Sequence, residues 1–133
     1  MNSSILILIP LAITGHAETQ QVSMRDVFNA IATVETGGES QPDEAVGAAG
    51  ERGRYQIMPA YWQDAVEFDP DLHGTPYERV TDPRVCEAIM VAYWRRYAAA
   101  WTAEEFCRLH NGGPSKRGTD RYWARCYQQL VKD

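Results

Sequence analysis

The feature that most constrains this chain is the helical spacing of its apolar residues, which recurs in several segments separated by glycine, proline and polar loops. In each segment the apolar side chains return every three or four residues, so they lie on one face of a helix. Residues suited to starting a helix precede four of the segments: Ser23, Asp82, Thr102 and Thr119. Such amphipathic helices must bury their apolar faces against other elements, which predicts a mainly α fold.

One stretch departs from this pattern. Residues 45–57, AVGAAGERGRYQI, combine two short extended pieces with glycines where the chain would turn. We therefore predict a small β-hairpin there, before a short helix that opens at Pro59. The expected class is mainly α (α+β). The 133 residues contain no internal repeat and are enough for one domain rather than two.

The first 17 residues are expected to lie outside this domain. The apolar run ILILIPLAI (Ile5–Ile13) precedes Thr14-Gly15-His16-Ala17, which has small residues at the −3 and −1 positions of a cut after Ala17. A run this short falls below the roughly 20 residues that span a bilayer. We interpret residues 1–17 as a secretory signal peptide and residues 18–133 as the functional domain, secreted or periplasmic.

Charge and cysteine content exclude some classes of function. Residues 18–78 carry 3 basic and 12 acidic side chains, and residues 79–133 carry 10 basic and 6 acidic. No run of Lys and Arg is dense enough to predict nucleic-acid binding. With no Cys-x-x-Cys pair, and with His73 and His110 as the two histidines after residue 17, we expect no structural zinc site. We expect no other metal and no cofactor. Of the three possible disulfides, Cys107–Cys126 is favoured because a tight turn joins the two helices that carry these residues, which leaves Cys86 as a buried thiol.

Glu35 is the first candidate for chemistry. It lies four residues after Ile31 and seven after Phe28, so it continues the face directed to the interior. The negative end of the helix dipole and partial burial both favour the neutral acid, so we expect a raised pKa. Gly37 and Gly38 would form a left-handed cap that leaves access open. A protonated acid at the rim of a cleft is what a glycosidase requires, although a helix-terminal glutamate can equally turn to solvent.

Three motifs extend this interpretation through a resemblance. The stretch from Ala45 to Pro59 resembles the segment that follows the catalytic glutamate in soluble lytic transglycosylases, and VETGG stands where those enzymes have Glu-Ser-Gly. GRYQIMPAYWQDA, RLHNGGP and RYWARC also resemble the invertebrate-type lysozymes. The resemblance covers Glu35 to Trp123. It implies a lysozyme-like fold, with helices around the hairpin and a substrate cleft between them. The cysteine-rich framework of animal invertebrate-type lysozymes is absent, because the chain has three cysteines.

The resemblance also implies roles for individual residues. Glu35 corresponds to the general acid. Gln56 would extend its amide into the cleft, although an amide bonded to the backbone is an equal alternative. His110 and Asn111 would form the floor of the sugar site. Tyr55 could stack on a sugar ring, whereas we assign Trp62 to the core.

The second carboxylate is the open choice. The candidates lie in the loop after Glu35, in the hairpin and in the following helix: Glu39, Asp43, Glu44, Glu51 and Asp64. We prefer Glu51, between two glycines of the hairpin, because it would face Glu35 and could activate water or stabilise positive charge. The alternative is a solvent-facing glutamate paired with Arg52 or Arg54.

These features predict a monomeric muramidase that cleaves the β-1,4 bond between N-acetylmuramic acid and N-acetylglucosamine in peptidoglycan. Two alternatives remain open. The chain could be a lytic transglycosylase that forms 1,6-anhydromuramic ends, or a catalytically silent glycan-binding module.

Overall fold

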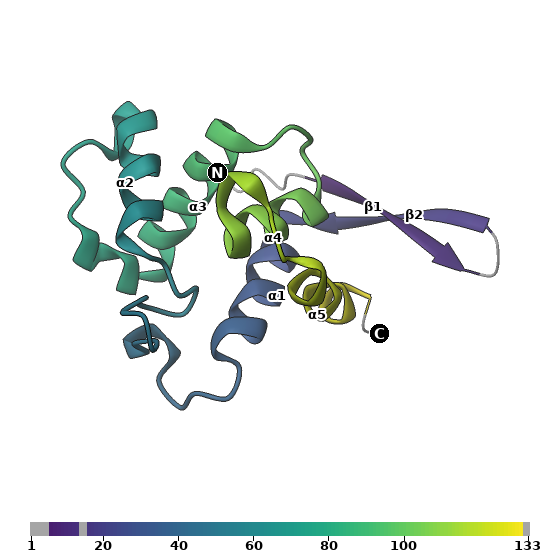
Figure 1. Ribbon diagram of the computed structural model, residues 1–133, viewed down its shortest axis with the longest axis horizontal. Coiled ribbons are helices and arrows are strands. Elements are labelled where there is room, and N and C mark those ends of the chain that lie inside the picture. The colour runs from purple at the N-terminus through teal and green to yellow at the C-terminus, as the bar shows by residue number, and fades with distance from the viewer. Residues whose placement is uncertain (1–5, 14–15, 132–133) are drawn as a thin grey trace. The chain divides into compact units, whose positions relative to one another are not determined.

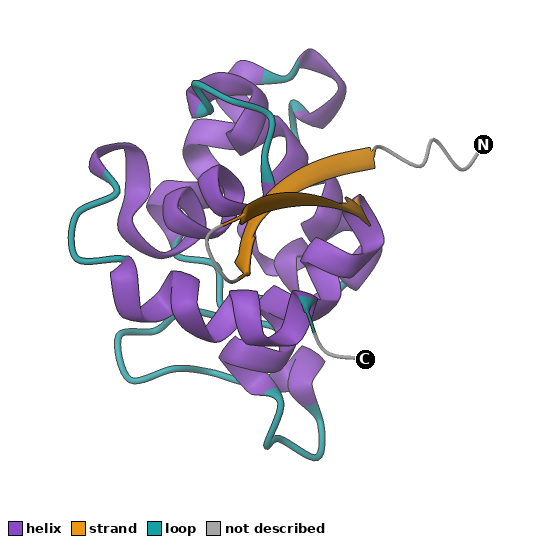
Figure 2. Ribbon diagram, turned by 90° about the vertical axis from the view of Figure 1, so that its right-hand side faces the viewer, coloured by secondary structure: helices purple, strands orange, loops and turns teal. Residues whose placement is uncertain are grey.

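The computed structural model of the protein describes residues 6–13 and 16–131. Within these ranges helices and loops make up most of the chain, and the strands are confined to one N-terminal hairpin (Figure 2). The predicted mainly α class is therefore confirmed. The α-helices of the described residues are α1 (Met24–Thr36), α2 (Pro59–Phe68), α3 (Pro83–Tyr97), α4 (Ala103–Gly112) and α5 (Asp120–Leu130).

Short-range hydrogen bonds explain where the helices begin. The Oγ of Ser23 accepts the N–H of Asp26 at 3.1 Å, and the Asp26 carboxylate accepts the N–H of Ser23 at 2.9 Å, so the two residues form a capping box and the predicted helix start at Ser23 is confirmed. Thr102 Oγ1 accepts the N–H of Glu105 at 3.2 Å and caps α4. Proline is the first residue of α2 and of α3, where its missing N–H leaves no helical bond unmade.

The described chain divides into two compact units, and the division falls within α1, after Ile31. The first unit contains residues up to 31 together with residues from 98 onward, and the second contains residues 32–97. In the first unit β1 (Leu6–Ile13) pairs with β2 (His16–Ser23) as an antiparallel hairpin, from Leu6 opposite Ser23 to Ile13 opposite His16. A cut after Ala17 would remove β1, and that cut stays a prediction. Residues 1–5 and 14–15 of the predicted signal peptide lie outside the described residues.

Helices α4 and α5 lie side by side in the first unit (Figure 1). Phe106 is fully buried in α4, and Trp101 meets its ring edge-on with centroids 4.6 Å apart. Three residues at four-residue spacing form the buried face of α5: Tyr122, Cys126 and Leu130. Trp123 and Tyr127, each next along the chain to one of these positions, are only half-buried.

The second unit is built around α2 and α3, which pack against each other. The rings of Tyr61 from α2 and Tyr93 from α3 stack with centroids 3.8 Å apart and planes 11° from parallel. Burial raises the pKa of Tyr93 to about 12. The other buried side chains of the second unit include Tyr55, Ile57, Ala65, Val80, Ile89, Met90 and Trp94.

The predicted hairpin at residues 45–57 takes a different form. In place of two strands, the structure has two isolated antiparallel bridges, Val46 with Arg52 and Arg52 with Ile57. The backbone has positive φ at Gly50 (89°), Gly53 (84°) and Gln56 (53°). A left-handed residue every three positions reverses the chain too often for a strand to extend.

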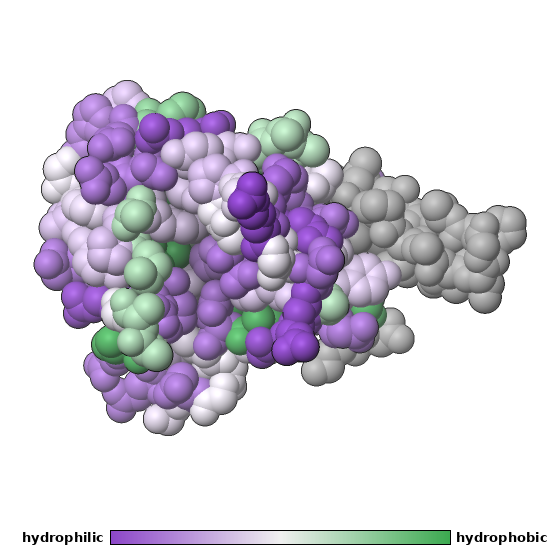
Figure 3. Space-filling model, viewed as in Figure 1, coloured by the Kyte–Doolittle hydropathy of each residue, from purple (hydrophilic) through white to green (hydrophobic). Residues whose placement is uncertain are grey.

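The surface of the described residues is largely polar. On the face shown in Figure 3 most of these residues are hydrophilic, and the hydrophobic ones form small separate patches. Large hydrophobic side chains are exposed at Val46, Met58, Phe68 and Trp101. In the part of the chain that the structure describes, no helix is both long and apolar enough to cross a membrane.

Candidate functional site

Glu35 lies in the last turn of α1 and is half-buried. Phe28 and Ile31, on the same face, are buried, so the glutamate does continue the buried stripe. The following glycines do not form the left-handed cap that we predicted, because neither has positive φ. Gly37 is instead needed for close approach: a Cβ there would lie 2.5 Å from the carbonyl oxygen of Thr33.

Thr36 ties this helix end to the loop of residues 45–57. Its hydroxyl donates to the carbonyl of Arg54 at 2.8 Å and shares the same hydrogen with the carbonyl of Ala32 at 3.2 Å. Thr36 is 5% exposed, so the bond to Arg54 is shielded from water. The neighbour of Glu35 in the chain is thereby joined to the backbone two residues before Gln56.

Backbone bonds hold the loop itself in a compact form. The N–H of Gly47 donates to the carbonyl of Glu51 at 2.7 Å, and the N–H of Gly53 donates to the carbonyl of Ala45 at 2.9 Å. Arg52 and Ile57 exchange two bonds, of 3.2 and 3.0 Å. Glu51 and Gln56 are therefore presented by backbone whose own polar groups are paired.

The side chains of Glu51 and Gln56 meet over Gly47. A Cβ on Gly47 would overlap both the Glu51 carboxylate and the amide oxygen of Gln56. The amide nitrogen of Gln56 donates to the carbonyls of Gly53 (2.9 Å) and Ala45 (3.3 Å). Because a carbonyl can only accept, the oxygen of this amide must point away from both, toward Glu51. The result is two acceptor oxygens side by side.

Glu51 differs from the other candidate carboxylates outside α1 because it is half-buried and also has no partner in the described chain. It is half-buried, and within the described chain nothing donates a hydrogen bond to its carboxylate or forms an ion pair with it. The predicted alternative partners are engaged elsewhere: Arg54 bonds Asp43 at 2.9 and 3.3 Å, and the Arg52 guanidinium lies over the Tyr77 ring at 6.0 Å. A carboxylate in this setting is available to a ligand.

The negative charge of Glu51 contributes to the raised pKa of Tyr77. Burial raises the pKa of Tyr77, the positive charge of Arg52 opposes this shift, and the negative charge of Glu51 adds to it. The Tyr77 hydroxyl donates to the carbonyl of Ile57 at 2.6 Å. Tyr77 therefore holds the end of the loop through the backbone of Ile57. The sequence analysis did not identify Tyr77.

The other candidate carboxylates differ from Glu51. Asp43 is held by both nitrogens of the Arg54 fork, and Asp64 accepts the hydroxyl of Tyr97 at 2.9 Å. Glu39 and Glu44 are exposed. Glu39 contributes to a groove of about 220 Å³ along the end of α1, whose lining also includes Thr33, Thr36 and Arg54.

Tyr55 is not available to a sugar ring, which corrects its predicted role. Its side chain is 1% exposed, and its hydroxyl donates to Glu87 of α3 at 2.7 Å. The bond spans 32 residues of chain, and Glu87 is itself buried, so local sequence could not reveal it. Tyr55 anchors the loop in the core, next to Gln56.

His110 and Asn111 belong to the first unit, near the end of α4. His110 is 9% exposed and lies beside the Tyr122 ring, with centroids 6.5 Å apart. Asn111 is exposed and helical, and the residue that caps the end of α4 is Gly113, with φ of 69°. A sugar-binding role for His110 and Asn111 stays a prediction.

Cys86, Cys107 and Cys126 are buried and in the free thiol form. Hydrogen bonding to the Cys126 thiol, together with burial, raises the pKa of Cys107. The structure therefore brings together the two cysteines that we predicted to pair, but no disulfide joins them. The disulfide itself stays a prediction.

Comparison with known proteins adds two relatives. No protein-family model matches the chain. Lysozyme 1 of Crassostrea virginica is 34% identical over 80 residues, covering 58% of this chain and 44% of that protein. The lysozyme of Magallana gigas is 33% identical over 87 residues, covering 58% of this chain and 58% of that protein. The chain thus spans about half the length of the curated relatives it matches. These matches support the resemblance to lysozymes, and neither is a lytic transglycosylase.

Proposed function

We propose that the chain is a lysozyme-type muramidase that hydrolyses the β-1,4 bond between N-acetylmuramic acid and N-acetylglucosamine in peptidoglycan. One observation carries the proposal: the unpaired, half-buried carboxylate of Glu51 lies beside the Gln56 oxygen, on a loop bonded through Thr36 to the helix end that holds Glu35. Similarity to two oyster lysozymes supports it.

Glu35 acts as the general acid in this proposal. Its carboxyl proton passes to the glycosidic oxygen as the bond from that oxygen to C1 of the muramic acid breaks, and positive charge develops at C1. The half-buried position at the C-terminal end of α1 favours the neutral form that this step requires.

Glu51 and Gln56 hold the attacking water. A water molecule has two hydrogens to donate, and the two adjacent oxygens over Gly47 accept both. The water lone pair then bonds to C1, and Glu51 takes the released proton. Both groups return to their starting states by proton exchange with solvent. A water activated in this way attacks from the face opposite the leaving group, so we expect inversion at C1.

The product profile separates hydrolysis from transglycosylation. A transglycosylase uses a hydroxyl of the sugar as nucleophile and needs no protein base for water. We expect reducing N-acetylmuramic ends from purified peptidoglycan, and a rate at least about tenfold lower for Glu51→Gln. The measurement is mass spectrometry of released muropeptides together with initial rates.

Glu44→Gln is the matched control, because Glu44 is an exposed carboxylate a few residues away. It should retain the wild-type rate. Predominantly 1,6-anhydro products with a fully active Glu51→Gln would replace the hydrolase by the transglycosylase. Binding of glycan strands without any cleavage would instead indicate a silent binding module.

The proposal includes a location and a partner. The apolar run at Ile5–Ile13 directs export, so the protein acts on the wall as a secreted or periplasmic monomer. Its partner is the glycan strand, and the reaction requires neither a cofactor nor a metal.

A further inference from the structure

The second unit contains a larger groove, of about 530 Å³, that includes none of the predicted site residues. Its walls are the segment from Leu72 to Pro76, Arg79, and the first turns of α3. The volume is within the range of sites for small molecules.

The lining combines a small apolar floor with cationic side chains. Leu72, Pro76, Val85 and Ala88 supply aliphatic surface, and no Phe, Tyr or Trp is present for stacking on a sugar or a base. Arg79, Arg84 and His73 supply the polar groups. Residues 32–97 carry 12 acidic and 6 basic side chains, so two arginines in one groove form a local exception in an acidic unit.

The guanidinium of Arg84 is available to bind a ligand. Its side chain is exposed and, within the described residues, forms no hydrogen bond or ion pair. Arg79 uses one nitrogen on Asp82 at 3.3 Å, which leaves its other N–H groups available. A planar guanidinium can bind both oxygens of a carboxylate.

The groove is held in shape before any ligand arrives. The indole N–H of Trp62 donates to the carbonyl of Thr75 at 2.9 Å, and the N–H of Thr75 donates to the carbonyl of Leu72 at 3.0 Å. Gly74 reverses the chain with φ of 85°. Less ordering is then required when a ligand binds.

We propose that this groove binds a short peptide that carries carboxylates and methyl side chains. Arg79 and Arg84 bind the carboxylates, and the aliphatic floor accepts the methyl groups, which an inorganic anion does not have. The inference rests on the proposed function, because the peptides attached to N-acetylmuramic acid are of this chemical class. The groove would thereby favour glycan that still carries its peptides.

Direct binding tests this proposal without any cleavage. Full-length Glu35→Gln protein is titrated with the free tetrapeptide L-Ala–γ-D-Glu–L-Lys–D-Ala, followed by calorimetry and by the NMR signals of the Trp62 indole and the Val85 amide. We expect saturable binding that shifts both signals. Arg84→Gln added to this protein should weaken binding by about threefold, and removal of both arginines by about tenfold.

Arg95→Gln is the matched control, since Arg95 is an exposed arginine of the same helix that does not line the groove. It should leave the affinity unchanged. Equal weakening by Arg95→Gln, no shift at Trp62 and Val85, or equally tight binding of inorganic phosphate would each overturn the proposal.

An activity comparison shows whether the groove serves the reaction. We expect wild type to cleave peptide-bearing strands faster than strands stripped of peptide, and Arg84→Gln to reduce that ratio by about threefold. An unchanged ratio would contradict the groove's role while leaving the muramidase intact. Failure of wild type to cleave either substrate would contradict the proposed function while leaving the peptide titration valid.

Discussion

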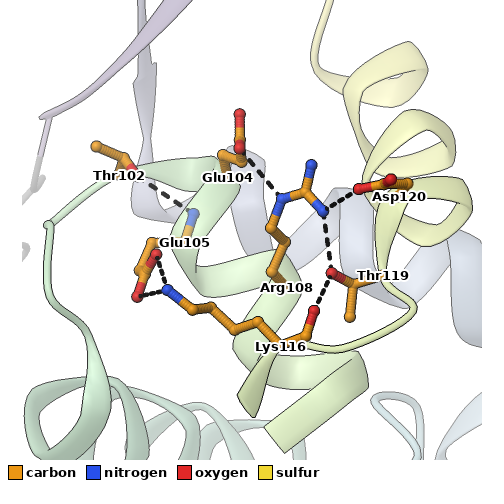
Figure 4. A network of polar contacts seen from close by, with 7 residues as sticks. All are labelled: Thr102, Glu104, Glu105, Arg108, Lys116, Thr119 and Asp120. Carbon is orange, nitrogen blue, oxygen red and sulfur yellow. Dashed lines mark hydrogen bonds and ion pairs between the residues drawn. The ribbon is translucent and has the colours of Figure 1, made fainter. Parts of the chain in front are cut away.

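Two polar regions of the molecule differ in whether their charged side chains have partners. Between α4 and α5 the charged side chains are linked in a network (Figure 4). Arg108 bonds Glu104 at 3.1 Å, Asp120 at 2.7 Å and the hydroxyl of Thr119 at 3.0 Å. Lys116 donates to both oxygens of Glu105, at 2.8 and 2.9 Å.

The loop of residues 45–57 contains the contrasting case. Its backbone groups are paired and Tyr55 is anchored in the core, yet Glu51 has no partner in the described chain. A half-buried carboxylate without a partner destabilises the fold unless a ligand or water compensates it. The contacts of the network near α5 therefore contribute to stability, whereas the unpaired carboxylate of Glu51 supports the catalytic role that we propose for it.

Electrostatics in the network agree with this distinction. Burial alone would lower the pKa of Arg108, but hydrogen bonds to Asp120 and Glu104 outweigh it and raise the pKa. The arginine therefore remains charged and is not suited to proton transfer.

The largest effect is expected at Glu35. Glu35→Gln keeps the shape of the side chain but removes the transferable proton, so the rate of wall clearance should fall at least about 100-fold. The thermal midpoint should stay the same or rise slightly, because a carboxylate at the negative end of a helix adds little to stability. Turbidity and thermal melts measure both. Activity within a few-fold of wild type would remove Glu35 from the mechanism.

Gly47→Ala tests the loop of residues 45–57, where Glu51 has no partner in the described chain. The added Cβ would displace the ends of the Glu51 and Gln56 side chains, so we expect the cleavage rate to fall about tenfold. Both are flexible side chains, so the loss of stability should stay below about 1.5 kcal/mol. Gly38→Ala is the control, because a Cβ there meets nothing within 4 Å. Equal rates for the two variants would show that the two oxygens over Gly47 do not participate.

Arg108→Gln tests the network of paired charges between α4 and α5 and should have the smallest effect. Two ion pairs are lost, and both acidic partners are substantially exposed, so the free energy of unfolding should fall by about 1 kcal/mol. Chemical denaturation of this variant and of Arg121→Gln, an exposed arginine of α5, measures the difference. We expect cleavage rates within about twofold of wild type for both. A large loss of activity in Arg108→Gln alone would mean that the network belongs to the site.

The candidate site could be predicted from the sequence only in part. Glu35 follows from helical spacing, because its position on the buried face depends on residues within two turns of it. Tyr55 could not be placed in this way, since its partner Glu87 is 32 residues distant. The orientation of the Gln56 amide could not be predicted either, because it depends on a positive φ of 53° that glutamine rarely adopts.

The sequence by itself determined where the helices begin and which faces they bury, because caps and helical periodicity act over three or four residues. It also indicated which residue types were available for chemistry. Only the tertiary structure decided which of several carboxylates is both half-buried and unpaired. Asp43 is bonded to Arg54, 11 residues away, and Asp64 to Tyr97, 33 residues away. Such pairings depend on how distant segments pack, which no local pattern records.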